Sequence, residues 1–198
     1  MTRVTLVRHF ETDWNRQSRI QGRSDQPLAD DVVAEARRRR PVKVGPESLP
    51  WFTSPLRRAT ETAILLGSHD ALRDSRLTEM DWGRWEGKRL DELRADLGQK
   101  MARNEALGLD FRPDGGESPR EVSERVKEWL LEVRGRDCAA VTHKGVIRAV
   151  LALALDWDMR TKPPVAIDWQ CAHVFSISSA GVITLTQANQ PLHTEADR

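Results

Sequence analysis

The sequence predicts an α/β fold with a mostly parallel central sheet and helices on both faces. Three short apolar runs have the length and composition of buried strands, and a loop or helical segment follows each. This recurrence of strand and helix is typical of parallel sheets. Near the C-terminus two more strand-like runs flank Ser178-Ser179-Ala180-Gly181, which predicts a hairpin and at least one antiparallel strand. The three runs are Val4–Val7, Pro50–Thr53 and Asp137–Thr142.

Composition limits the function classes. The 198 residues fit one domain, 1–198, and 31 basic against 30 acidic residues give a net charge of +1. Near-neutrality argues against a nucleic-acid binder, so any anion site needs locally concentrated cations. Cys138 and Cys171 show neither metal-ligand spacing nor a disulfide framework, and we expect buried free thiols. Without a signal peptide or long apolar span, we expect a cytoplasmic protein that does not bind membranes.

The first strand ends at Arg8-His9. Ligands of open parallel sheets bind where strands end. There Arg8 could hold a phosphate bidentately, while His9 could attack phosphorus or transfer a proton. Alone, the dipeptide fits an exposed turn after an edge strand better than an active site. Its significance depends on the residues at the ends of the other strands.

A turn-rich segment, 20–28, precedes a predicted helix over Ala29–Arg40 that Pro41 ends. The run Arg37–Arg40 is either an anion patch or a solvated helix end, and the second is favoured.

The second strand leads into a helix that we expect to begin with Ser54 as N-cap and Pro55 at its first position, and to reach about Gly67. Arg57 then lies in the first turn, where an anion would offset its cost to the helix dipole. Arg58 fits an exposed surface charge better than Arg57 does.

The middle of the chain predicts a small helical insertion at about 79–116. A short strand near 71–73 leads to a glycine-broken loop, 77–87, whose Trp82 and Trp85 we expect in the core. Glu79 in that loop could donate a proton. Leu90–Leu107 is predicted as one weakly amphipathic helix of a lid or subdomain.

The last third predicts the rest of the sheet. Ser118-Pro119-Arg120-Glu121 is a capping box that opens a core-facing helix, and Glu117 before it is either a dipole partner or a site residue. The third strand ends at His143, and Lys144 opens an apolar central helix through Leu155. The final strands are expected at 172–177 and 182–186, with a poorly ordered polar tail from Gln187.

His9, Arg57 and His143 each come after a strand in this prediction. Parallel strands bring their carboxyl ends to one edge, so these residues and Arg8 should converge. Two guanidiniums and two imidazoles suit a dianion, and phosphoryl transfer needs such preorganised positive charge but no metal when arginines supply it. An imidazole with a pKa near ~6.5 is largely neutral at pH 7 and can attack phosphorus.

At this point the chain resembles the histidine phosphatase superfamily, also called the phosphoglycerate mutase-like family, from Val4 to about Leu155. The blocks that carry the resemblance occur in order: Arg8-His9-x-Glu11-Thr12-x-Trp14-Asn15, Gln21-Gly22-x-x-Asp25-x-Pro27-Leu28, Ser54-Pro55-Leu56-Arg57-Arg58-Ala59-x-Glu61-Thr62-Ala63, Glu79-x-x-x-Gly83-x-Trp85-Glu86-Gly87, Gly116-Glu117-Ser118 and Thr142-His143-x-Gly145-Val146-Ile147-Arg148.

The resemblance implies roles for these residues. His9 would be the phosphorylated nucleophile, and Glu79 would protonate the leaving oxygen. The phosphoryl group would be bound by Arg8, Arg57 and His143, and the substrate side would be lined by Asn15, Gln21 and Gly22, with Thr12 nearby. Members of this family use no metal, and we expect no cofactor.

Two residues depart from the family pattern. The family usually has glycine where this chain has Phe10 and Lys144. We expect Phe10 to narrow the entrance, and Lys144 either to contribute a substrate-binding cation or to point to solvent. Both bear on substrate preference.

The sequence thus predicts a metal-independent phosphatase that hydrolyses a small phosphomonoester through phosphohistidine, as a monomer or homodimer. The alternatives are a 2,3-bisphosphoglycerate-dependent phosphoglycerate mutase and a non-catalytic relative that binds a phosphorylated ligand.

Overall fold

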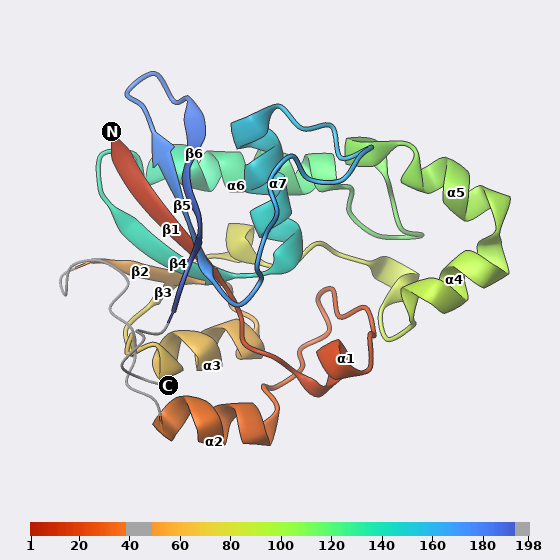
Figure 1. The fold of residues 1–198 in the computed structure, drawn as a ribbon, viewed down its shortest axis with the longest axis horizontal. Coiled ribbons are helices and arrows are strands. Elements are labelled where there is room, and N and C mark those ends of the chain that lie inside the picture. The colour runs from red at the N-terminus through yellow and green to blue at the C-terminus, as the bar shows by residue number, and fades with distance from the viewer. Residues whose placement is uncertain (39–48, 193–198) are drawn as a thin grey trace.

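The computed structural model describes residues 1–38 and 49–192, and the second half of the run Arg37–Arg40, Pro41 and the last six residues lie outside that part. The described strands form one sheet in the order β3-β2-β4-β1-β5-β6 (Figure 1). Their bounds are Thr2–Arg8 (β1), Trp51–Thr53 (β2), Leu72–Arg73 (β3), Cys138–Thr142 (β4), Ala172–Ile177 (β5) and Ile183–Gln190 (β6).

The strand directions confirm the predicted mixed sheet. β1, β2, β3 and β4 are parallel, whereas β5 is antiparallel to both β1 and β6. The last strand runs further than expected, since Gln190 pairs with Ala172. The predicted disorder is therefore wrong for 187–190, where backbone pairing with β5 orders polar side chains that carry no apolar signal.

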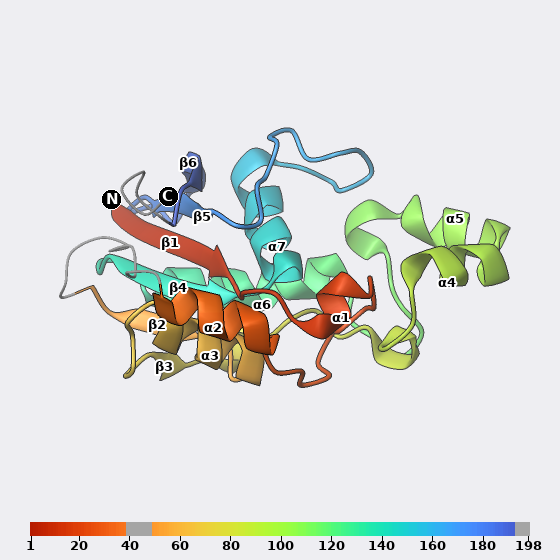
Figure 2. The ribbon, with the colours of Figure 1, turned by 60° about the horizontal axis from the view of Figure 1, so that its bottom comes forward.

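Helices cover both faces of the sheet, as predicted (Figures 1 and 2). On one face α6 (Pro119–Glu132) and α7 (Lys144–Leu155) pack against side chains that include Val4, Leu6 and Ala140. On the other, α3 (Arg57–Leu65) packs against Val7, Ala139 and Val141, and α2 (Asp30–Arg38) lies outside α3. The alternation of neighbouring residues between the two cores results from the two-residue period of a strand.

Two predicted helix starts have different outcomes. The capping box at Ser118 with Pro119 inside the helix is confirmed, since Ser118 Oγ accepts from Glu121 N at 3.3 Å. The predicted cap of α3 is wrong. Ser54 accepts a hydrogen bond from Leu56 N at 3.3 Å in a turn outside the helix, and α3 begins at Arg57.

A helical unit projects from the sheet on the side of α1 (Asp13–Arg16) (Figure 1). The single helix expected over Leu90–Leu107 is two helices, α4 (Leu90–Leu97) and α5 (Gln99–Glu105), because Gly98 breaks the path with φ +50°. Three short 3₁₀ helices flank them: η1 (Ser75–Leu77), η2 (Gly83–Trp85) and η3 (Gly108–Asp110). Trp85 is buried with Leu93 and Met101 in a small core of this unit, as expected, and Trp82 packs against it.

The two cysteines differ. Cys138 is buried in β4, and burial raises the pKa of its thiol to about 12. Cys171 is partly exposed before β5, so the expectation of burial is wrong for it, and its Sγ lies 3.6 Å from an oxygen of Asp168. Within residues 1–38 and 49–192, no helix is long and apolar enough to cross a membrane.

Candidate active site

Two histidines meet at the carboxyl edge of the sheet. β1 and β4 are parallel neighbours with Arg8 opposite Thr142, so the next residues, His9 and His143, lie side by side. His9 N donates to Thr142 O at 2.9 Å, which extends the pairing beyond the strands. The two ring centroids are 5.2 Å apart. The structure thus brings together the two imidazoles that the sequence placed after separate strands.

His9 is held as a neutral imidazole with one free nitrogen. Its Nδ1 lies 2.6 Å from Phe10 O, a contact in which Nδ1–H donates and Nε2 keeps its lone pair. Phe10 is fixed in turn, because its N–H donates to Thr62 Oγ1 at 2.9 Å. Burial, with smaller contributions from Arg58 and Arg8, holds the pKa of His9 well below 6.5. A neutral, oriented ring is the form that can act as a nucleophile.

His143 is fully buried, and neither of its ring nitrogens has a hydrogen-bond partner within the described part of the chain. Burial, followed by Arg58 and His9, keeps its pKa well below 6.5. An unpartnered buried polar group costs roughly 1–3 kcal/mol unless something binds it. A ring nitrogen of His143 is therefore available to a ligand bound beside His9.

The arginine beside the histidines is Arg58, and the expected placement of Arg57 is wrong. Arg58 is completely buried, and its Nη1 and Nη2 donate to Ser24 O at 2.9 Å and Gly22 O at 2.7 Å. The side chain of Arg57 is 61% exposed, and its Nε binds Glu61 at 2.6 Å. That carboxylate raises the pKa of Arg57 and pairs with the guanidinium that was expected to bind the phosphoryl group.

The positions of the two arginines around the helix explain why Arg58, and not Arg57, points into the site. The buried positions of α3 are Arg58, Ala59, Thr62 and Ala63, a set of i, i+1, i+4 and i+5 on one face. Arg57 and Glu61 lie on the opposite face, four residues apart. The alanines and Thr62 were visible in the sequence, and their period gives the signal that places Arg58 inward.

Arg8, at the end of β1, supplies the second guanidinium. Burial lowers its pKa, while Glu79 and Glu11 oppose that change, so it remains charged at neutral pH. Its Nε, like that of Arg58, is buried with no partner among the described residues. Unpartnered guanidinium donors beside neutral imidazoles give a cluster that is short of negative charge.

Glu79 approaches this cluster from the loop between η1 and η2. Its Oε1 accepts from Met80 N at 2.9 Å, and its Oε2 accepts from Gly145 N at 3.2 Å in the first turn of α7. A Cβ at position 145 would collide with the Glu79 carboxylate, so this glycine permits the close approach. The structure thus places Glu79 near both Arg8 and Arg58, whose pKa values its charge raises.

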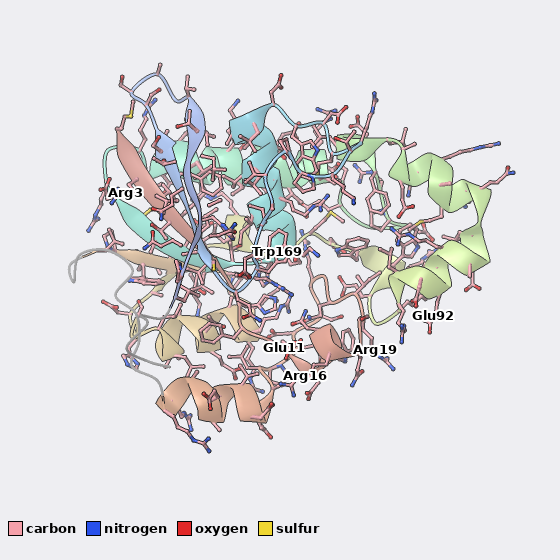
Figure 3. All side chains as sticks on the ribbon, viewed as in Figure 1. Arg3, Glu11, Arg16, Arg19, Glu92 and Trp169 are labelled. Atoms are coloured by element: carbon pink, nitrogen blue, oxygen red, sulfur yellow. The ribbon has the colours of Figure 1, made fainter. Side chains whose placement is uncertain are left out.

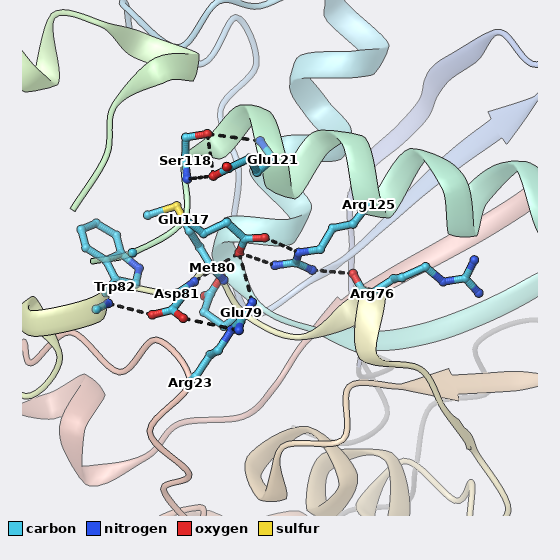
Figure 4. A network of polar contacts seen from close by, with 12 residues as sticks. Arg23, Arg76, Glu79, Met80, Asp81, Trp82, Glu117, Ser118, Glu121 and Arg125 are labelled. Carbon is cyan, nitrogen blue, oxygen red and sulfur yellow. Dashed lines mark hydrogen bonds and ion pairs between the residues drawn. The ribbon is translucent and has the colours of Figure 1, made fainter. Parts of the chain in front are cut away.

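A largely buried ion pair fixes the segment that carries Glu79 (Figure 4). Arg125 of α6 binds Glu117 through its Nε at 2.7 Å and donates from Nη1 to Arg76 O at 2.6 Å. Glu117 also accepts from Asp81 N at 3.3 Å. Beside the two interpretations left open for it, Glu117 is thus a structural ion-pair partner that ties the segment on both sides of Glu79 to α6.

The remaining expected residues lie around the loop after β1. Thr12 caps α1 and exchanges hydrogen bonds with Asn15, whose Oδ1 accepts from Thr12 N at 3.0 Å, so both shape the loop. Gln21 is buried, and its Oε1 has no partner among the described residues. Gly22 has φ +54° and presents its carbonyl to Arg58.

Lys144 is exposed on α7. Its Nζ lies 5.2 Å from the ring centroid of Trp169, which stands in the loop beside α7 (Figure 3).

Sequence reasoning missed Glu86. Its carboxylate accepts from Arg23 N at 2.7 Å, Ser24 N at 2.9 Å and Ser24 Oγ at 2.6 Å. It therefore shapes the loop whose carbonyls hold Arg58, and a Cβ at Gly22 would collide with it. Its position in the family block marked it, but its partners are backbone groups about 60 residues away in the chain, which no local pattern reveals.

The site suits a phosphoryl dianion between two neutral imidazoles and two guanidiniums, with a carboxyl group on one side. In residues 1–38 and 49–192, no three His, Cys, Asp or Glu side chains are arranged to hold a metal ion. The cluster can supply a nucleophile, charge stabilisation and a proton donor.

Comparisons with known proteins find similar sequences and structures. The sequence model of the histidine phosphatase superfamily (branch 1) matches residues 4–190. A 2,3-bisphosphoglycerate-dependent phosphoglycerate mutase of Azorhizobium caulinodans is 30% identical over 163 residues, 75% of this chain and 79% of that protein. Phosphoserine phosphatase 1 of Hydrogenobacter thermophilus is 30% identical over 169 residues, 80% of this chain and 79% of that protein. A mycobacterial glucosyl-3-phosphoglycerate phosphatase, solved in complex with VO3, superimposes with a TM-score of 0.75 at 28% identity, over 96% of this chain and 100% of that chain.

Proposed function

The chain belongs to the histidine phosphatase superfamily, and on that premise we propose that it is a metal-independent phosphatase that hydrolyses a small phosphomonoester through phosphohistidine. The observation that carries the proposal is the buried cluster at the sheet edge. Two neutral imidazoles, His9 and His143, lie 5.2 Å apart beside two arginines whose buried Nε atoms have no partner in the described chain. Such a cluster favours a bound dianion.

In the first step, His9 Nε2 attacks phosphorus as the bond from phosphorus to the ester oxygen breaks. Glu79, in its protonated form, gives its proton to the leaving oxygen, and the alcohol departs. Arg8, Arg58 and His143 hold the equatorial oxygens, where charge is concentrated in the transition state. The role first expected for Arg57 is here assigned to Arg58.

In the second step, water attacks the phosphorus of phosphohistidine. The Glu79 carboxylate takes a proton from that water, and the bond from phosphorus to Nε2 breaks. Inorganic phosphate leaves, and His9 returns to its neutral form. Glu79 gives up one proton in the first step and regains one from water in the second, so the cycle needs no other acid.

A phosphoglycerate mutase is the alternative that the relatives favour, since several of them are named as mutases. A mutase must keep its bisphosphate and exclude water. We favour hydrolysis because the region between Glu79 and Gly116 is short and contributes few cations. The phosphatases among the relatives support the same preference.

The test is hydrolysis of p-nitrophenyl phosphate in EDTA by the wild type and by His9→Ala. Metal-independent release of phosphate that the variant loses supports the proposal. Turnover of phosphoglycerate only with added 2,3-bisphosphoglycerate, with little phosphate released, supports the mutase instead. Phosphate binding without turnover of any ester indicates a non-catalytic relative.

A further inference from the structure

A cavity of about 500 Å³ opens beside the phosphoryl site. Glu79 and Gly145 line it, together with residues of α4, the segment around η3 and the loop after α7. This volume is in the range that holds small organic ligands. Under the proposed function Glu79 faces the leaving oxygen, so the body of the leaving group extends into this cavity.

Much of the cavity wall is apolar. Side chains from five separate segments contribute to it: Met80, Trp82, Leu90, Phe111, Pro119 and Met159. Trp82 and Phe111 pack edge to face with ring centroids 5.7 Å apart, which fixes one wall. A leaving group with an apolar body would gain free energy from contact with these surfaces, whereas a wholly polar one would lose its own hydration against them.

The cavity also holds cations whose surroundings differ. Arg94 is paired with Glu105 at 2.7 Å, and Arg160 lies 3.9 Å from Asp158. Lys144 and Arg148, by contrast, form no ion pair with a carboxylate of the described residues. Both lie on α7, four residues apart, and therefore on the same helix face.

Tryptophans fix the positions of these two cations. Arg148 lies over Trp157 at 4.9 Å, and Lys144 lies over Trp169 at 5.2 Å. Trp157 is buried, and its Nε1 donates to Thr161 O at 3.2 Å, so the platform under Arg148 is rigid. Partial desolvation of the Lys144 ammonium, and then the charges of Arg8 and Arg148, lower the pKa of Lys144, whereas the Glu79 carboxylate raises it.

We propose that the substrate's leaving group has an apolar body and a second anionic end, a carboxylate or a phosphate, that Arg148 and Lys144 bind. The apolar walls take the body, and the two tryptophan-backed cations take the charge. Because the inference rests on the proposed function for the direction of the leaving group, its test must separate the two.

Four alkyl phosphates separate the contributions of body and charge: hexyl phosphate, its analogue with a terminal carboxylate, glycerol phosphate and phosphoglycerate. The alcohols of the two hexyl esters have similar basicity, so leaving-group chemistry varies little between these two. We expect kcat/KM for the carboxylated hexyl ester to exceed that for hexyl phosphate by about tenfold, the effect of a charge-assisted hydrogen bond, and to exceed that for phosphoglycerate. Hexanediol bisphosphate then shows which anion is preferred at the far end.

Variants test the residues. Arg148→Met and Lys144→Met should each bring the ratio of carboxylated to plain hexyl ester close to one, and Arg148→Lys should keep part of it. Arg103→Met, an exposed arginine of α5 outside the cavity, should leave the ratio unchanged. A structural effect alone would lower both esters together. A wild-type ratio near one, or a ratio that both methionine variants preserve, overturns the inference.

The two proposals fail differently. Hydrolysis of hexyl phosphate that requires His9, with no preference for the carboxylate, overturns only the anion subsite. If no ester turns over, the proposed hydrolysis fails, and calorimetry compares the same compounds as ligands. Tighter binding of the carboxylated ester that Arg148→Met abolishes then supports the subsite, and equal affinities overturn it.

Discussion

Arg57 and Arg58 are neighbours in the sequence but lie on opposite faces of α3, which makes them a matched pair for mutation. Arg58→Met should lower kcat/KM by about 100-fold or more, because it removes a buried charge from the developing transition state. Arg57→Met should change it by less than about threefold, since its ion pair with Glu61 is solvent-exposed. Steady-state kinetics with p-nitrophenyl phosphate measures both.

Arg58 also holds the loop carbonyls of Gly22 and Ser24, so folding must be checked. Thermal unfolding of Arg58→Met and Arg58→Lys serves as the control. A larger loss of activity in Arg57→Met than in a folded Arg58→Met would contradict the assignment.

The neutral histidines predict how stability depends on pH. His9 and His143 have pKa values well below 6.5 in the folded protein and near ~6.5 when unfolded. Below pH ~6.5 the unfolded chain therefore binds protons that the folded protein cannot. As the pH is lowered below ~6.5, the free energy of unfolding should therefore decrease. The decrease is up to about 1.4 kcal/mol per pH unit for each histidine, until the rings protonate in the folded protein.

Urea denaturation at pH 7.5, 6.5 and 5.5 measures this slope. Burial also lowers the pKa of His173, so this histidine contributes to the slope in the same direction. His143→Gln should therefore reduce the slope without removing it. Stability that is constant between pH 6.5 and 5.5 would show that the buried imidazoles are already charged or accessible.

For single residues, the sequence predicts correctly the position of site residues that directly follow a strand. Arg8, His9 and His143 come after apolar runs, and the register of β1 with β4 brings them together. The sequence-based prediction is wrong for Arg58. It starts the helix at Ser54-Pro55 and selects Arg57 as the site arginine, whereas α3 begins at Arg57 and buries Arg58. It also misses the role of Glu86, whose partners are backbone N–H groups of a distant loop.

Among the elements, the loop that carries Glu79 depends on α6 for its position. Glu117 and Arg125 are only 12% and 17% exposed and bind each other at 2.7 Å. Arg125→Met leaves the Glu117 carboxylate largely buried, and among the described residues its remaining partners are the Asp81 N–H at 3.3 Å and Arg23 at 3.8 Å. We expect a loss of about 3 kcal/mol in the free energy of unfolding, measured by urea denaturation.

Arg84→Met is the matched control for this prediction. Its ion pair with Asp114 has side chains 80% and 62% exposed, so its loss should cost at most about 0.5 kcal/mol. Equal effects of the two substitutions would mean that the Arg125 network does not stabilise the fold.

The contact between this loop and the first turn of α7 sets the position of the proposed acid. Glu79→Gln keeps the hydrogen bonds that a carbonyl oxygen can accept from Met80 or Gly145 but removes the proton. Activity should fall by about 100-fold with alkyl phosphates and far less with p-nitrophenyl phosphate, whose leaving group needs no proton. Kinetics with both esters tests this, and equal losses would argue against an acid role.

Element prediction succeeds where the apolar period is strong. α7 is found with the expected bounds because its residues are nearly all apolar, and α6 because its cap and core face agree. The division at Gly98 and the extension of β6 to Gln190 depend on tertiary contacts and backbone geometry that the pattern of polar residues does not encode.

For the whole molecule, the topology accounts for the site. Three parallel strands, β1, β4 and β2, are neighbours in the sheet although the paired residues of β2 and β4 are 88 positions apart in the sequence. Their carboxyl ends deliver Arg8 with His9, His143, and the turn before Arg58 to one edge. Fold class and this convergence could be predicted from sequence, whereas the cavity walls could not, because segments far apart in the chain build them.

The most direct test of the central claim is to trap phosphohistidine at His9. A single turnover with excess enzyme and a radiolabelled phosphomonoester, quenched in alkali because phosphohistidine is acid-labile, is followed by peptide mapping. We predict label on the peptide that contains His9, absent from His9→Ala and chased by unlabelled ester. Release of phosphate by a folded wild type with no labelled histidine, or undiminished turnover by His9→Ala, would contradict the mechanism.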